Sequence, residues 1–173
     1  MGIDPGVANT GFGVVRVAGG RIGALDAGVI EAPPGEPAER RLALIHAGLR
    51  ELIGWHQPVA VALEDVYFGK NVRSALAVGE ARGVALLAAA ECGVACFGYT
   101  PQAVKMSVCG TGGADKRQVQ RMVGQLLALP RPPRSDHAAD ALAVAICHAS
   151  HARPSRAFAP AGLGALRPEA SAG

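Results

Sequence analysis

Three acidic side chains stand where acids are unusual. Asp4 ends a short apolar run and meets a Pro-Gly turn, Glu64 ends a second apolar run, and Asp140 lies in an otherwise apolar helical segment. Carboxylates in such places are costly to remove from water unless a positive charge compensates them. Their oxygens are ligands that suit Mg²⁺ and Mn²⁺. Each acid alone could be a loop-edge residue or a helix cap, but together they predict a divalent-metal site.

The segment around Asp140 offers a fourth ligand. Asp136 precedes Asp140 by four residues and His137 precedes it by three, so either side chain can share a helical face with Asp140. That face continues through Ala141 and Val144, which points it at the sheet. Spacing alone does not choose between Asp136 and His137. His137 could also be an ordinary polar residue at a helix N-terminus.

Apolar periodicity predicts the elements that position these residues. Strands are expected at 2–4, 12–17, 21–30, 59–64 and 94–99, and the run 59–63 is typical of a strand buried on both faces. Helices are expected at 39–55, 74–91, 101–108, 116–129 and 135–148, with Ser74 and Ser135 as caps. This order predicts a mixed α/β sheet covered by helices on both faces. Residues 1–152 are expected to form one domain, and 153–173, rich in Ala, Pro and Gly, a disordered tail.

Composition narrows the class of protein. The chain has 173 residues, half of them hydrophobic, which suits one compact domain. No apolar run approaches the ~20 residues that a bilayer needs, and no basic, apolar leader is present. The four cysteines contain no close pair typical of zinc sites, so we expect a reducing cytoplasm. Residues 101–134 hold six basic side chains and one acid, which favours a polyanionic partner, although a solvated face would look the same.

Several segments together carry a family resemblance. They are Gly2-Ile3-Asp4-Pro5-Gly6, Thr10-Gly11-Phe12-Gly13, Leu63-Glu64-Asp65-Val66-Tyr67-Phe68-Gly69-Lys70-Asn71, Gly79-Glu80-Ala81-Arg82-Gly83, Val104-Lys105, Asp115-Lys116-Arg117-Gln118 and Asp136-His137-Ala138-Ala139-Asp140. In this order and spacing, over roughly residues 1–150, the chain resembles the RuvC Holliday-junction resolvase family. The resemblance implies a ribonuclease-H-like, mixed five-stranded sheet flanked by helices. It also implies a homodimer that makes paired, Mg²⁺-dependent nicks in four-way DNA junctions during recombination and repair, with a branch-migration helicase complex as partner.

The resemblance also assigns roles to residues. The four acidic positions of the family fall on Asp4, Glu64, His137 and Asp140, which implies that they hold two Mg²⁺ ions, with Mn²⁺ as a substitute. Two such ions can activate a water and stabilise the leaving oxygen. Lys116 is the residue that the family pattern places at the scissile phosphate. His137 departs from the commoner aspartate and leaves the cluster with one less negative charge. Very little precedes Asp4, so either the first strand is short or the true N-terminus lies upstream.

Further residues are expected to bind DNA. They are Tyr67, Lys70, Arg73, Lys105, Lys116 and Arg117. Tyr67, and less so Phe68, could stack on unpaired bases at a junction centre, although ordinary core packing would explain both. Small residues at 75, 79 and 83 recur along one helical face. This stripe could pack on the sheet, and the family implies a dimer seam there.

Two rival functions remain at this stage. Actin-like and sugar-kinase-like ATPases also end their first strand in an Asp-x-Gly turn, but they need two lobes and this chain is long enough for one. The other rival is a catalytically silent module that only binds junctions. The intact set of acids argues against that reading, and a cleavage assay decides it.

Overall fold

The computed structural model describes residues 1–65, 72–133 and 135–151. The strands within these ranges are β1 Gly2–Asp4, β2 Asn9–Ala18, β3 Arg21–Glu31, β4 Val61–Glu64 and β5 Cys96–Tyr99. The helices are α1 Ala38–His56, α2 Val72–Glu91, α3 Pro101–Cys109, α4 Lys116–Leu126 and α5 Asp136–His151. The sheet has the order β3-β2-β1-β4-β5. β1 is antiparallel to β2 and parallel to β4, so the sheet is mixed.

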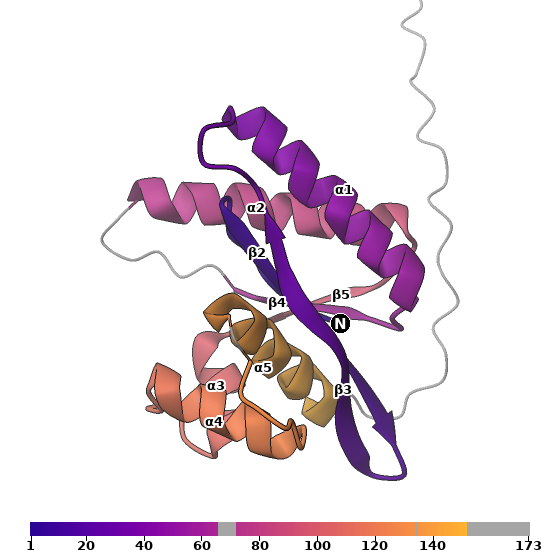
Figure 1. Ribbon diagram of the computed structural model, residues 1–173, viewed down its shortest axis with the longest axis vertical. Helices are drawn as coiled ribbons and strands as arrows, with labels where there is room; N and C mark the ends of the chain where they lie inside the picture. Colours follow the sequence, from indigo (N-terminus) through magenta and orange to yellow (C-terminus); the bar gives the residue numbers. More distant parts are fainter. Residues whose placement is uncertain (66–71, 134, 152–173) are drawn as a thin grey trace, which may run out of the picture.

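Helices cover both faces of this sheet. α1 and α2 lie on one side, and α3, α4 and α5 lie on the other (Figure 1). Ile3 and Leu63 pack with Leu49 of α1 in one apolar core. Ala62 packs with Val144 of α5 in the other. The predicted α/β architecture is therefore confirmed. No helix in the described ranges is both long and apolar enough to cross a membrane.

The central strand β4 is buried on both faces, as its sequence predicts, but it is shorter than expected. Val61, Ala62 and Leu63 are fully buried. Val59 lies before the strand and is 98% exposed. Pairing begins only where the amino group of Met1 donates to Ala60 O at 2.9 Å and the Val61 amide donates to Ala95 O at 2.9 Å. The residues that precede Ala60 have no neighbouring strand to pair with.

Helix α5 lies against bare backbone on β1 and β2. A Cβ on Gly2 would lie 2.1 Å from Ala141 O, and a Cβ on Gly11 would lie 2.1 Å from His137 O. A Cβ on Gly13 would lie 2.8 Å from Leu142. No larger residue fits at these places without moving the helix. The glycines thus set how closely the first turns of α5 approach the ends of the strands.

Several predicted boundaries shift. Ser74 is not a cap, because α2 already includes Val72. The fourth helix ends at Leu126 and not at 129, since Ala128 adopts a left-handed φ of 49°. β2 and β3 are joined by Gly19-Gly20, whose positive φ values suit a two-residue hairpin turn and extend both strands. The predicted tail lies outside the described residues, so the division at 152 stays a prediction.

Candidate active site

Asp4 and Glu64 lie side by side at one edge of the sheet. β1 and β4 are parallel, with Ile3 opposite Leu63, so the residue that follows on each strand reaches the same edge. Asp4 and Glu64 are both partly buried. Burial, followed by the negative charges of Asp4 and Asp140, raises the pKa of Glu64 to about 7. Burial also raises the pKa of Asp4. The two carboxylates therefore share one poorly solvated neighbourhood.

Helix α5 adds His137 and Asp140 to this neighbourhood. His137 Nδ1 lies 2.7 Å from Asp4 Oδ2, a contact that the close approach of α5 to Gly11 permits. Burial raises the pKa of Asp140, Lys116 lowers it, and Asp4 raises it further. Asp4 of β1 and His137 of α5 thus meet although 133 positions separate them in the sequence. Glu64 of β4 lies close enough to Asp4 and Asp140 for their charges to raise its pKa.

Asp136 faces a different partner. Its carboxylate accepts a hydrogen bond from Gln120 Nε2 and lies 3.1 Å from Lys116 Nζ. Lys116 lowers the pKa of Asp136, which is exposed. The spacing of the sequence left Asp136 and His137 as alternatives. In the fold His137 contacts Asp4, whereas Asp136 contacts α4.

Lys116 enters the site from the first residue of α4. The side chain of Asp115 caps that helix by accepting from the Gln118 amide at 2.8 Å. Lys116 Nζ lies 3.5 Å from Asp140 Oδ2. Although desolvation works in the opposite direction, the contacts with Asp136 and Asp140 raise the pKa of Lys116. Lys116 is therefore charged and is held between two carboxylates.

A cavity of about 210 Å³ joins these groups. Glu64, Lys105, Lys116 and Asp140 line it, together with apolar side chains of α3 and α4 and Ala143 of α5. Lys105 lowers the pKa of Glu64 and so partly offsets the raising effects of burial and the two aspartates. The pocket thus holds two carboxylates and two lysines. This arrangement suits a ligand that carries both a cation and an anionic group.

The donor set fits a divalent cation by its chemistry. In the described residues, no group of three or more His, Cys, Asp or Glu side chains is arranged to hold a metal as it stands. Instead Asp4 pairs with His137, and Asp140 pairs with Lys116. The carboxylates raise the pKa of Glu64, so the site has negative charge that its own cations do not fully neutralise. Oxygen ligands of this kind prefer Mg²⁺ or Mn²⁺.

Only some of the predicted DNA-binding residues lie at the pocket. Lys105 and Lys116 line the pocket, whereas Arg73 and Arg117 do not, although both are exposed. Tyr67 and Lys70, together with Phe68, lie outside the described residues.

Sequence reasoning gave no role to Asp115 as the cap of α4 or to the glycines under α5. The pattern of Asp115 followed three residues later by Gln118 resembles a capping box and could have predicted where α4 begins. The glycines carried no comparable signal.

A mixed five-stranded sheet with helices on both faces and carboxylates at the ends of its central strands is a ribonuclease-H-like fold. The family model for the crossover junction endodeoxyribonuclease RuvC matches residues 1–148. The chain belongs to the RuvC family.

Named relatives agree with this assignment. The crossover junction endodeoxyribonuclease RuvC of Moorella thermoacetica is 55% identical over 152 residues, which cover 88% of this chain and 91% of that protein. That of Pelotomaculum thermopropionicum is 52% identical, covering 87% and 92%. A solved structure of T. thermophilus RuvC in complex with a Holliday junction substrate has a TM-score of 0.82 and 42% identity, covering 87% and 92%. The yeast mitochondrial resolvase Ydc2, at 12% identity and a TM-score of 0.57, shares the fold alone.

Proposed function

We propose that this protein is a structure-selective endonuclease that resolves four-way DNA junctions by paired hydrolysis of phosphodiester bonds during recombination and repair. The observation that carries the proposal is that Glu64, Asp140 and Lys116 line one pocket, with Asp4 close enough to raise the pKa of Glu64. Relatives that cover nearly the whole chain are named crossover junction endodeoxyribonucleases. The solved relative from T. thermophilus holds a Holliday junction.

The RuvC family depends on a divalent metal. We infer Mg²⁺, two ions in each site, with Mn²⁺ as a substitute, and we assign Asp4, Glu64, Asp140 and His137 as their ligands. When bound, the ions supply an activated water and stabilise the charge on the leaving oxygen. The residues contribute position: β1 and β4 fix two carboxylates in parallel register, and α5 adds Asp140 and His137 from above them.

Lys116 is assigned to the phosphate that is cut. Its side chain lines the pocket and its amino group contacts Asp140, and the capped start of α4 holds its backbone in place. A fixed positive charge at that place stabilises the negative charge that develops on the phosphate oxygens. Lys105, which also lines the pocket, is assigned to the same polyanion. Arg73 and Arg117 are proposed to contact more distant phosphates. Tyr67 and Lys70 are proposed to contact DNA at the centre of the junction.

The assembly is proposed to be a homodimer. A four-way junction is two-fold symmetric, and coordinated nicks need two active sites. The protein is further proposed to act in the cytoplasm with a branch-migration helicase complex. Light scattering at micromolar concentration is expected to give twice the mass of the chain, and a monomer with or without junction DNA would contradict the dimer.

The test is a cleavage assay on a plasmid that extrudes a cruciform. Wild-type protein with Mg²⁺ is expected to cut the two opposed strands, and chelation by EDTA is expected to stop cutting. Asp140→Asn should bind junctions at least as well as wild type, because losing a negative charge cannot weaken phosphate attraction, yet should not cut. Glu39→Gln removes an acid of α1, a helix on the opposite face of the sheet from α3, α4 and α5, and should cut normally.

The outcome separates the two classes of function. Binding without any cutting by wild-type protein, over a range of Mg²⁺ and Mn²⁺ concentrations, would identify a silent junction-binding module. Cutting by Asp140→Asn at the wild-type rate would refute the ligand assignment.

A further inference from the structure

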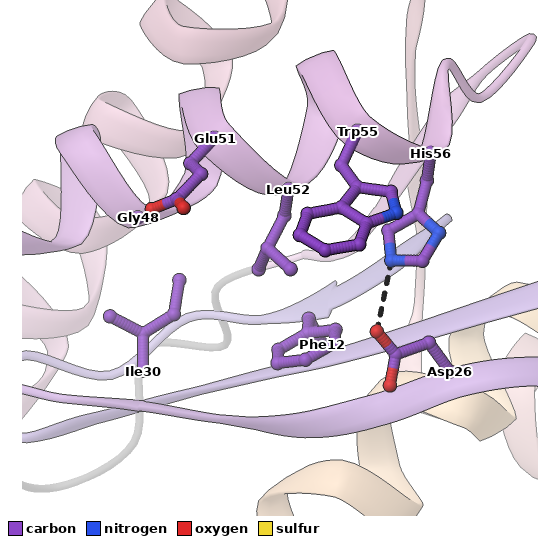
Figure 2. Close-up of a pocket in the computed structure, with 8 residues that line it drawn as sticks. All are labelled: Phe12, Asp26, Ile30, Gly48, Glu51, Leu52, Trp55 and His56. Atoms are coloured by element: carbon purple, nitrogen blue, oxygen red, sulfur yellow. Dashed lines mark hydrogen bonds and ion pairs between the residues drawn. The ribbon is translucent and has the colours of Figure 1, made fainter.

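A second concavity lies on the other side of the sheet, between α1 and the strands β2 and β3. Its volume is about 340 Å³. Figure 2 shows Leu52 and Trp55 projecting from α1 toward Phe12 of β2, with Ile30 of β3 beside them. The floor is apolar. Gly48 of α1 keeps the floor open, because a Cβ there would lie 3.2 Å from Ile30.

The polar residues of this groove, which we call the α1 groove, are two acids, Asp26 and Glu51, and one histidine, His56. His56 Nε2 contacts Asp26 Oδ2 at 2.9 Å, which fixes the Asp26 carboxylate at the edge of the groove (Figure 2). Glu51 also lines the groove and is exposed. No residue in the described part of the chain pairs with the Glu51 carboxylate. Its carboxylate is therefore available to a group on another molecule.

Trp55 forms an exposed aromatic wall of the groove, with Asp26 on its side of the groove and Glu51 one helical turn back along α1 (Figure 2). Its side chain is 80% exposed. It is the only tryptophan of the chain. An indole face beside carboxylates is the arrangement that attracts a cation with an apolar stem, since the ring face and the acids both carry negative potential. An arginine side chain has this character, and Trp and Arg dominate protein interfaces energetically.

Two other occupants fit the α1 groove poorly. Nucleic acid is disfavoured, because Asp26 and Glu51 would face its phosphates, and Lys105 and Lys116 lie on the opposite layer of the fold. A second copy related by two-fold symmetry would bring the same patch against itself. Asp26 and Glu51 of the two copies would then meet, and like charges that face each other oppose association.

We propose that the α1 groove docks a segment of a partner protein that carries an arginine next to an aliphatic or aromatic residue. The arginine stacks on Trp55 and pairs with Glu51, while the apolar neighbour fills the space over Phe12 and Ile30. A concavity of about 340 Å³ holds one or two side chains rather than a whole helix. The partner therefore contributes a short motif. The site is independent of DNA cleavage and lies on the layer opposite to it.

The experiment selects peptides from a random dodecapeptide phage library on the full-length protein, with counter-selection on Glu51→Arg. Enriched sequences are expected to hold an arginine within two residues of an apolar side chain. A synthetic peptide made from them should shift the emission of Trp55 to shorter wavelength. Anisotropy of the labelled peptide should show roughly tenfold weaker binding to Glu51→Arg and to Trp55→Ala.

Matched controls separate the groove from the rest of α1. Glu39→Arg makes the same charge reversal, and Leu44→Ala removes another exposed apolar side chain, both on α1 but outside the groove. Both should bind the peptide within about twofold of wild type. Circular dichroism and thermal unfolding check that every variant is folded.

Each contrary outcome overturns the proposal. No enrichment over Glu51→Arg, acidic consensus sequences, or equal losses in Glu39→Arg would show that the groove does not select this motif. Peptide binding that appears only after residues 152–173 are deleted would make the chain's own C-terminal segment the occupant. A fall in molecular mass on Trp55→Ala would make it a second copy.

Discussion

In metal-free protein, Glu64→Gln is expected to stabilise the fold at pH 8. The pKa of Glu64 is raised from 4.5 to about 7 by burial and by Asp4 and Asp140. Below pH 4.5 the side chain is protonated in both the folded and the unfolded chain, so the contribution of this proton to stability has its full size. Between pH 4.5 and 7 the unfolded chain loses that proton first. The contribution to stability therefore falls as the pH rises through this window, and it stays low above pH 7.

The size of this effect follows from the two pKa values. The step from 4.5 to about 7 corresponds to about 3 kcal/mol. Because Glu64 keeps some contact with water, screening reduces this to about 1–2 kcal/mol. The glutamine keeps the shape of the side chain and has no charge. At pH 8 its midpoint of urea unfolding should thus lie about 1 M above that of wild type.

The assay is urea unfolding of wild type and Glu64→Gln in EDTA, at a series of pH values from 4.5 to 8. Titrating groups that are not coupled to Glu64 cancel in the difference between the two proteins. That difference should grow with pH across the window, and Mg²⁺ at pH 8 should shrink it by stabilising the wild type more. A difference that stays flat from pH 4.5 to 8 would refute the reasoning that burial and neighbouring acids raise this pKa.

Three further predictions concern residues around the same pocket. Lys116→Ala should slow junction cleavage by about 10²-fold or more while weakening binding far less, as single-turnover rates and gel shifts would show; equal losses would make it one phosphate contact among many. His137→Asp should retain cleavage, and His137→Ala should lose most of it with partial rescue by Mn²⁺. Asp136→Ala should slow cleavage only severalfold, because it removes only one of the two carboxylates that contact Lys116. The reverse pattern would replace His137 by Asp136 in the site. Gly11→Ala should lower the free energy of unfolding by about 2 kcal/mol or more, because its Cβ would overlap His137 O, and an unchanged thermal midpoint would contradict the close seating of α5.

The convergence of the acids could be predicted because it depends on short-range patterns. Asp4 and Glu64 each end an apolar run, and parallel pairing of neighbouring strands brings such ends together. The helix after residue 135 was equally evident from its apolar face. The family resemblance then assigned the fold, and the sheet order confirms it.

What the sequence could not predict depends on contacts between distant segments. Asp136 and His137 differ by one step of about 100° around a helix, so only the seating of α5 on Gly2, Gly11 and Gly13 decides which of them meets Asp4. The pairing of Lys116 with Asp136 joins two helices whose separation is set by the core. The α1 groove likewise has no sequence signature, because Trp55 and Asp26 come together only when α1 lies across β3.

The contact between Lys116 and Asp140 links two binding events. In the protein alone these two side chains form an ion pair with each other. A cation held by Asp140 would leave Lys116 paired with Asp136 alone and so freer to meet an incoming phosphate, and a phosphate held by Lys116 would leave Asp140 freer to hold a cation. By thermodynamic reciprocity the two ligands must strengthen each other's affinity by the same factor. The protein should therefore bind metal weakly in the absence of DNA and assemble its loaded form chiefly on the junction itself, which confines the cutting state to the place where it is needed.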